Sequence, residues 1–297
     1  MTAAEEPVLA VKDLSSGYGD LTAIRGISYQ VRRGEIVAMF GANGAGKTTT
    51  LLATVGELPK ASGEVFWQGA RATSSTYKLA RLGLAFVPEA PSVISGLSGL
   101  DNLRIGRGPV SLALDYFPEL KPLLNRRAGL LSGGEQQILA MARALAGQPD
   151  VLLVDELSLG LAPLVVDRLM SALRVIADST GVGVVLVEQQ ARRALTIADT
   201  WYLLRNGTIV DQGGASSGAD LDAAYLGSMT GPARPACRTP RPVGKPGQCA
   251  PTPAVIPPGE LSSRVTGGEW LCRTCPPGPW AVMVPSVMQL LRSDLLA

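Results

Sequence analysis

A glycine-rich loop is the residue pattern with the clearest chemistry in this chain. Residues Gly41-Ala-Asn-Gly-Ala-Gly46-Lys47-Thr48 match G-x-x-x-x-G-K-[ST] and lie between a short apolar run and a helical pattern. The glycines allow several backbone N–H groups to point at phosphate oxygens, and the following helix start adds positive potential. We expect Lys47 to reach the β- and γ-phosphates of a nucleotide and the Thr48 hydroxyl to bind Mg²⁺. The alternative is a glycine-rich turn before a structural helix.

A pair of carboxylates, Asp155 and Glu156, ends the apolar run that begins at Val151. A strand at this position would place Asp155 at the carboxyl edge of a sheet, where ligands gather in open α/β folds. Asp155 could then hold Mg²⁺, and Glu156 could accept a proton from an attacking water. On its own, this pair could equally be the solvated start of a loop.

A second anion-binding helix start is predicted at Leu131-Ser132-Gly133-Gly134-Glu135. Ser132 is a typical N-cap residue, and the two glycines leave backbone N–H groups open. One chain can hardly use both phosphate-binding segments on a single nucleotide. A head-to-tail dimer could, with Ser132 of one subunit facing the glycine-rich loop of the other.

Short apolar runs alternate with helical patterns through most of the chain. We predict strands at 8–14, 23–31, 35–40, 84–87, 151–155 and 183–188, and helices at 47–56, 135–146, 164–178 and 191–198. Such alternation predicts an α/β fold with a mainly parallel sheet covered on both faces.

Composition excludes several other kinds of chemistry. The 297 residues include no histidine, which rules out a Ser-His-Asp triad, a Cys-His pair, His-ligated zinc and an imidazole base. The formal net charge of +2 argues against a dedicated nucleic-acid binder. No apolar stretch approaches the roughly 18 residues that span a bilayer. Because the N-terminal residues are acidic where a signal peptide is basic, we expect the chain to start as a cytosolic protein.

In order and spacing, these motifs resemble those of the ATP-binding subunits of ABC transporters, over about residues 8–227. The resemblance implies a P-loop NTPase fold with a RecA-like core, an N-terminal antiparallel β subdomain and a small helical subdomain at about 90–147. It implies that ATP and Mg²⁺ bind and that ATP hydrolysis is coupled to transmembrane transport. It also implies that Tyr18 stacks on adenine, the alternative being a turn aromatic that packs on the sheet.

Further site residues follow from the resemblance. Glu89 takes the place of the family's coupling glutamine, and Gln189 takes the place of its switch histidine. The catalytic residues are expected to be Glu156, Lys47 and Gln189, and the metal ligands Thr48, Asp155 and Glu89. The residues expected to contact nucleotide are Tyr18, Gly41, Ala42, Asn43, Gly44, Ala45, Gly46, Lys47, Thr48, Thr49, Glu89, Ser132, Gly133, Gly134 and Glu135.

Several segments resemble one branch of the family, the ATPases of branched-chain amino acid importers. They are Glu89, Leu131–Gln137, Ser158-Leu-Gly-Leu-Ala-Pro163 and Glu188-Gln-Gln-Ala-Arg-Arg-Ala194. Within the branch they favour the smaller of the two paired ATPase subunits, which carries Glu-Gln where its partner carries Glu-His. Importers of urea and short-chain amides are the nearest competitors. Leu157 departs from the branch, because a proline usually follows the catalytic glutamate.

The resemblance also implies partners and a location. We expect a head-to-tail dimer with a second ABC ATPase subunit, identical or paralogous, two integral membrane permease subunits, an indirect link to a solute-binding protein, and no nucleic acid. The expected location is the cytoplasmic face of the cell membrane. Two other classes are a soluble ABC ATPase of DNA repair or translation and a regulator that does not hydrolyse. Only 85 residues separate Lys47 from Ser132 in the sequence, which leaves no room for the long insertions of the first class. The intact Glu156 argues against the second.

Residues 228–297 differ from the rest in composition. They contain more than half of the 22 prolines and all four cysteines, Cys237, Cys249, Cys272 and Cys275. Frequent proline disfavours long helices and sheet ladders, so we expect an irregular tail, disordered or loosely packed, with no part in ATP chemistry. One alternative is a zinc site, half of it formed by the last two cysteines and the rest by Cys237 and Cys249. The other is a redox pair. Only 282–296 is apolar enough to dock.

Overall fold

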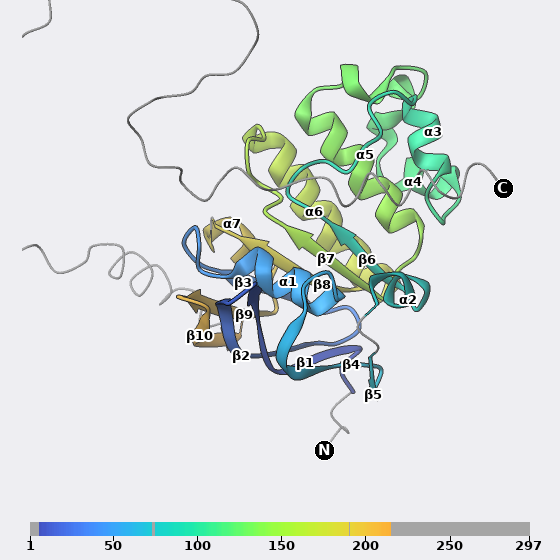
Figure 1. The fold of residues 1–297 in the computed structure, drawn as a ribbon. Helices are drawn as coiled ribbons and strands as arrows, with labels where there is room; N and C mark the ends of the chain where they lie inside the picture. Colours follow the sequence, from blue (N-terminus) through green and yellow to red (C-terminus); the bar gives the residue numbers. More distant parts are fainter. Residues whose placement is uncertain (1–5, 73–74, 190, 215–297) are drawn as a thin grey trace, which may run out of the picture. The chain divides into compact units, whose positions relative to one another are not determined.

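The computed structural model describes residues 6–72, 75–189 and 191–214, which belong to a compact unit at Met1–Cys237 (Figure 1). Two β-sheets and two groups of helices make up this part. The predicted tail, with its cysteines and its apolar end, lies outside the described residues. No helix within the described ranges is both long and apolar enough to span a membrane.

The central sheet has six strands in the order β10-β9-β3-β8-β7-β6. Five of them are parallel, and β10 pairs antiparallel with β9 at one edge. Every residue of β3, β7 and β8 is buried, as expected for parallel strands covered on both faces. The strands are β3 (Ile36–Phe40), β6 (Leu84–Val87), β7 (Val151–Asp155), β8 (Gly183–Glu188), β9 (Thr200–Arg205) and β10 (Thr208–Gly214).

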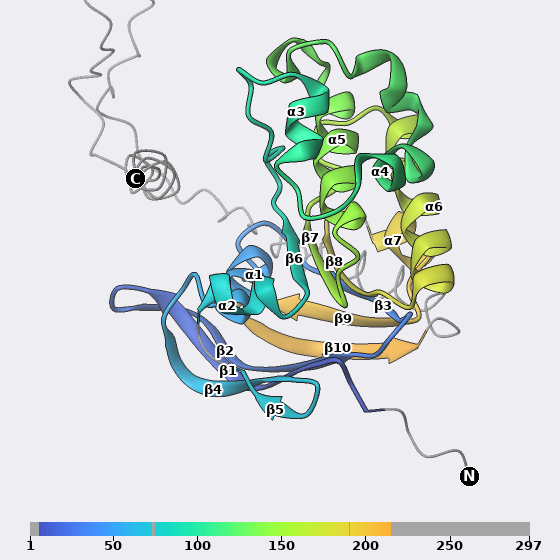
Figure 2. The same ribbon diagram turned by 90° about the vertical axis from the view of Figure 1, so that its right-hand side faces the viewer.

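Alternate residues of these strands face two different cores, because side chains of a strand point to opposite faces of its sheet. Ile36, Ala38 and Phe40 pack with α5, α6 and α7, whereas Val37 and Met39 pack with α1 and the second sheet. Figure 2 shows α5 and α6 on one side of the central sheet and β1, β2 and β4 on the other. The helices are α1 (Lys47–Val55), α5 (Gly133–Ala146), α6 (Pro163–Thr180) and α7 (Ala191–Leu195).

The second sheet is antiparallel, with the strand order β2-β1-β4-β5. Its first two strands pair as a hairpin and correspond to the strands predicted at 8–14 and 23–31, but both are longer than expected. The strand β4 was not predicted, because it begins with polar and small residues and is held by its pairing with β1. The strands are β1 (Leu9–Tyr18), β2 (Leu21–Val31), β4 (Lys60–Trp67) and β5 (Ala70–Arg71).

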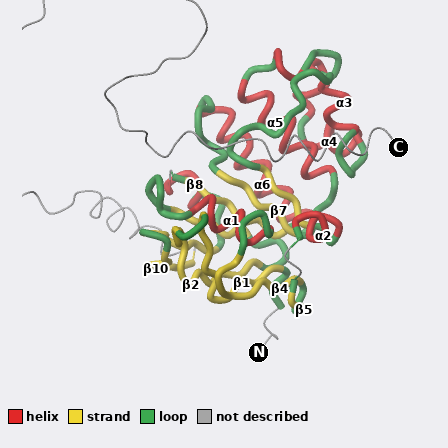
Figure 3. The backbone as a smooth tube through the Cα atoms, viewed as in Figure 1, coloured by secondary structure: helices red, strands yellow, loops and turns green. Residues whose placement is uncertain are grey.

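Short helices connect β6 to α5, in the range where the sequence predicts a helical subdomain. Phe117 directly precedes a 3-10 helix at Pro118–Leu123, and Leu120 lies within it. Both side chains are buried. Figure 3 shows α3, α4 and α5 gathered apart from the antiparallel strands. The helices are α2 (Thr76–Arg81), which precedes β6, α3 (Gly99–Arg104) and α4 (Val110–Tyr116).

Candidate active site

The predicted phosphate-binding loop joins the end of β3 to the start of α1 (Figure 1). Gly44 and Gly46 have φ angles of 79° and 100°, in the left-handed region that favours glycine. A Cβ atom on Gly46 would lie 2.7 Å from Cγ2 of Ile24, and one on Gly41 would lie 2.7 Å from the carbonyl oxygen of Leu204. The fold therefore requires glycine at both ends of the loop.

Lys47, the first residue of α1, turns its ammonium group back over the loop. Its Nζ donates to the carbonyl oxygens of Gly41 at 3.0 Å and Ala42 at 3.3 Å. It also lies 3.0 Å from Oε1 of Glu156, and only 4% of the Lys47 side chain is exposed. Oxygen atoms thus surround the ammonium group, which is the environment that phosphate oxygens would also provide.

Asp155, at the end of β7, has the chemistry of a metal ligand. It is buried, and its Oδ1 has no hydrogen-bond partner among the described residues. The pKa of Asp155 is raised to about 6, chiefly by burial. A hydrogen bond from Thr48 and the charge of Lys47 act to lower the pKa, and the charges of Glu156 and Glu89 act to raise it. A carboxylate oxygen beside a hydroxyl fits Mg²⁺, which in nucleotide sites takes one or two protein oxygens along with phosphates.

The described residues contain no group of three or more Asp, Glu, Cys or His side chains that could hold a metal ion by itself. Glu89 lies just after β6 and is exposed. Its charge is one of the causes that raise the pKa of Asp155.

Glu156 has an unusual backbone conformation. Its φ angle is 44°, in the left-handed region, and its N–H donates to the carbonyl oxygen of Val187 at 2.9 Å. This bond ties the end of β7 to β8. Leu157, which departs from the family's proline, is buried in the core beneath the helices. The position therefore retains an apolar anchor, although it loses the fixed φ of proline.

The order of the strands brings three predicted segments to one edge of the sheet. Because β8 lies between β3 and β7, the segments that follow Phe40, Asp155 and Glu188 leave the sheet side by side. Gln189, directly after β8, is half-buried at this edge. The sequence prediction overlooked Glu188 itself, although a carboxylate that closes an apolar run is a signal for a functional group.

Tyr18 is the last residue of β1, and its side chain is 40% exposed. The start of the adjacent strand lies against the loop, since Gly46 faces Ala23 and Ile24 of β2. The exposed ring is therefore available to a ligand at this end of the hairpin.

Ser132 caps α5 in the way the sequence predicts. Its Oγ accepts a bond from the N–H of Glu135 at 3.3 Å, and the Glu135 carboxylate accepts one from the N–H of Ser132 at 2.7 Å. The Ser132 hydroxyl also donates to the Glu135 carboxylate at 2.9 Å. The bonds from the N–H and the hydroxyl of Ser132 hold the pKa of Glu135 below its usual range. In Figures 1 and 2, α5 stands apart from α1, so the two segments predicted to bind phosphate lie in different parts of the fold.

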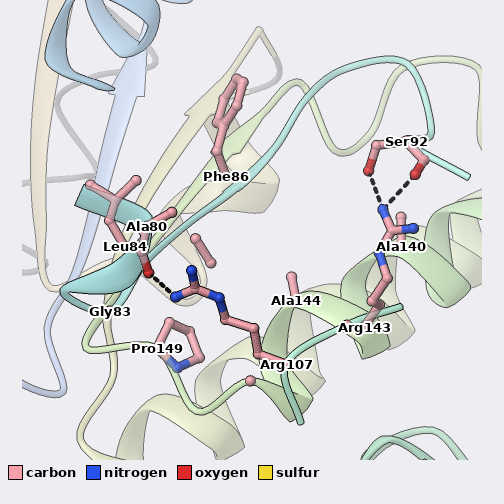
Figure 4. A pocket seen from close by; sticks show the side chains of 13 residues that line it. Ala80, Gly83, Leu84, Phe86, Ser92, Arg107, Ala140, Arg143, Ala144 and Pro149 are labelled. Carbon is pink, nitrogen blue, oxygen red and sulfur yellow. Dashed lines mark hydrogen bonds between the residues drawn. The ribbon is translucent and has the colours of Figure 1, made fainter. Parts of the chain in front are cut away.

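A separate cavity of about 380 Å³ lies between β6 and α5 and includes none of the predicted site residues (Figure 4). Two arginines reach across it. Arg143 of α5 donates to the carbonyl oxygen and, at 2.8 Å, to the Oγ of Ser92, and Arg107 donates to the carbonyl oxygen of Ala80. Arg143 therefore ties α5 to the segment that follows Glu89.

The fold and the site together define a P-loop nucleotide-binding cassette. Comparison with known proteins narrows this class. A sequence model of the family described as "ABC transporter" matches residues 24–158.

Two relatives match over most of their length. The high-affinity branched-chain amino acid transport ATP-binding protein BraG of Pseudomonas aeruginosa is 40% identical over 235 residues, which cover 74% of this chain and 100% of that protein. The probable branched-chain amino acid transport ATP-binding protein LivF of Archaeoglobus fulgidus is 34% identical over 219 residues, which cover 70% and 93%.

A solved dimeric structure of an ATP-binding cassette in a post-hydrolysis state, bound to ADP and Pi, has the same fold. Its TM-score is 0.62 at 23% identity, and the match covers 70% of this chain and 98% of that one. The chain belongs to the ATP-binding subunits of ABC transporters, and it is an ATPase.

Proposed function

We propose that this chain hydrolyses ATP to drive the uptake of branched-chain amino acids through separate permease subunits. The observation that carries the choice of solute is the 40% identity to BraG over the whole of that protein. The segments at Leu131–Gln137, Ser158–Pro163 and Glu188–Gln189 support the same branch of the family.

The site residues suggest how ATP would be hydrolysed. Phosphate oxygens would replace the carbonyl oxygens of Gly41 and Ala42 around Lys47, and the loop N–H groups would bind the remaining oxygens. The ammonium group of Lys47 would then pair with the γ-phosphate in place of Glu156. Glu156 would be free to accept a proton from the water that attacks phosphorus, as the bond to the leaving ADP oxygen breaks.

Thr48 and Asp155, with Glu89 nearby, are the residues that would hold Mg²⁺. When bound, Mg²⁺ neutralises charge on the β- and γ-phosphates. Gln189 would donate a hydrogen bond from its amide to the γ-phosphate and orient the water through its oxygen. Tyr18 would stack on the adenine ring.

We further propose that the chain works as a head-to-tail dimer with a second ABC ATPase subunit, either identical or a paralogue. The separation of α5 from α1 supports this arrangement, because Ser132, Gly133, Gly134 and Glu135 then contact the nucleotide of the partner. The dimer would bind two membrane permeases at the cytoplasmic face of the membrane, and through them a solute-binding protein.

Uptake of labelled leucine, urea and a short-chain amide by a deletion strain tests the solute. We expect the deletion to abolish leucine uptake, and the wild-type gene, but not Lys47→Ala, to restore it. Loss of urea or amide uptake with normal leucine uptake would assign those solutes instead. Unchanged uptake of all three, with no permease co-purified, would favour a soluble ABC ATPase outside transport.

A further inference from the structure

Glu188 is a buried carboxylate that the proposed reaction does not use. It ends β8, pairs with Phe40 of β3 and is 1% exposed. The five residues before it, 183–187, are apolar or glycine and are buried as well. A carboxylate is costly to bury unless its oxygens accept hydrogen bonds, so the partners of Glu188 indicate its role.

Both oxygens of Glu188 accept hydrogen bonds from a single residue. The Ser158 N–H donates to Oε1 at 2.9 Å, and the Ser158 hydroxyl donates to Oε2 at 2.6 Å. Hydrogen bonds to an ionised carboxylate are short and strong. Two such bonds fix both the main chain and the side chain of Ser158, which lies on the segment that leaves the neighbouring strand.

The two residues of this contact are sequence neighbours of the two residues proposed to act at the γ-phosphate. Ser158 is the second residue after Glu156, and Gln189 directly follows Glu188. The N–H of Glu156 is itself bonded to Val187. The backbone of the segment 156–158 is thus held at both ends by consecutive residues of β8, which restricts the direction of the Glu156 side chain.

The surroundings of Glu188 do not suit a second general base. Its oxygens are occupied by Ser158, whereas the Glu156 side chain is 12% exposed and faces Lys47. A group that accepts a proton from substrate water must reach that water. Any effect of Glu188 on hydrolysis is therefore transmitted through Ser158.

We propose that Glu188 is a positioning residue: it fixes Ser158, and thereby the orientation of the Glu156 carboxylate relative to Gln189. The inference rests on the proposed role of Glu156 as the base. A correctly directed carboxylate contributes to the chemical step and has little effect on ATP binding, which depends on the glycine-rich loop.

ATPase kinetics of variants at both positions test the proposal. We expect Glu188→Ala and Ser158→Ala each to lower kcat at least about tenfold, with KM and Kd for ATP within about twofold of wild type. The double variant should be no slower than Glu188→Ala, because both substitutions disrupt the same contact between Ser158 and Glu188. Ser158→Thr keeps the hydroxyl and should stay within about threefold of wild type.

Two further variants guard against loss of folding. Glu188→Gln keeps the side-chain volume and an acceptor for the Ser158 N–H, and it should give an intermediate kcat. Tyr29→Phe removes a buried hydrogen bond to Thr54 outside the predicted site and should leave kcat unchanged. Thermal unfolding of each variant identifies any that does not fold.

The outcomes separate this inference from the proposed function. Wild-type kcat in folded Ser158→Ala and Glu188→Gln would overturn the positioning role, as would multiplicative losses in the double variant or a change confined to KM. Glu156→Gln is measured alongside. Normal turnover in that variant would contradict Glu156 as base, whereas slow turnover there with normal turnover at Glu188 and Ser158 would contradict the positioning role alone.

Discussion

The Nζ of Lys47 and the Oε1 of Glu156 lie 3.0 Å apart, which joins the start of α1 to the end of β7. The sequence places these residues far apart in the chain and predicts separate roles for them. The contact means that Glu156 and phosphate would compete for the same cation. We therefore expect nucleotide binding to separate the Glu156 carboxylate from Lys47, which frees Glu156 to act as the base.

Lys47→Ala should greatly weaken ATP binding, because it removes the cation that would meet the β- and γ-phosphates. A loss of about 100-fold in affinity corresponds to about 3 kcal/mol, the range expected for a hydrogen bond between charged groups. Titration with a fluorescent ATP analogue measures it. Lys78→Ala, which changes an exposed lysine of α2, is the control. Wild-type affinity in Lys47→Ala would show that the loop does not bind ATP as proposed.

Gly46→Ala and Gly44→Ala form a matched pair in the loop. Both glycines have positive φ, but a Cβ on Gly46 would clash with Ile24, whereas one on Gly44 would meet no atom within 4 Å. We expect Gly46→Ala to abolish ATP binding and Gly44→Ala to cost about 1 kcal/mol of backbone strain. Isothermal titration with ATP compares the two. Equal affinities would mean that the loop shape in the structure is not the one that binds.

Asp155 should make stability depend on pH. Its folded pKa of about 6 lies above the unfolded value, so the folded chain holds a proton that the unfolded chain releases between about pH 4 and pH 6. The free energy of unfolding should therefore fall as pH rises through this window, by up to about 3 kcal/mol from this group.

Urea unfolding of the wild type and Asp155→Asn, at pH 4.5 and pH 7, isolates the effect. Burial also raises the pKa of Glu188, which contributes in the same direction. The quantity to compare is thus the change in the free energy of unfolding between pH 4.5 and pH 7, in the wild type and in Asp155→Asn. We expect Asp155→Asn to lose less stability between these pH values, and an identical loss in both would contradict the buried state of Asp155.

The sequence predicted the strands β6, β7 and β8 with the ends that the structure has. These strands are largely buried, so their apolar runs are continuous and their ends are marked by polar residues or glycine. The same reasoning missed β4, whose first residues, Lys60 to Gly63, are polar or small. That strand depends on its pairing with β1, which is a long-range property of the fold.

The predicted site residues at the sheet edge were readable from motifs, but their contacts were not. Two contacts depend on the strand order β3-β8-β7: that between Lys47 and Glu156, and that between Ser158 and Glu188. This order in the sheet differs from the order of the strands along the chain, so the sequence did not predict it. The left-handed φ of Glu156 was also unpredictable, since glutamate seldom adopts it.

Gln189 should behave as a working substitute for the family's histidine. Its amide can donate to phosphate and accept from water, but it does not titrate in this range. We expect Gln189→His to stay active and to add an ionisation near pH 6.5 that the wild-type rate profile lacks. The pH dependence of kcat at saturating Mg²⁺ and ATP measures this. A folded but inactive Gln189→His would contradict the substitution of one residue for the other.

The central claim is that Glu156 accepts the proton in ATP hydrolysis at the site that Lys47 and Asp155 complete. The most direct test is the single-turnover rate of ATP hydrolysis by Glu156→Gln, with ATP affinity measured on the same protein and Glu57→Gln as the control. We predict unchanged ATP affinity, a rate at least about 100-fold below wild type, and an ATP-bound dimer that persists in size-exclusion chromatography. Hydrolysis by Glu156→Gln at the wild-type rate would contradict the claim and assign the base to another residue.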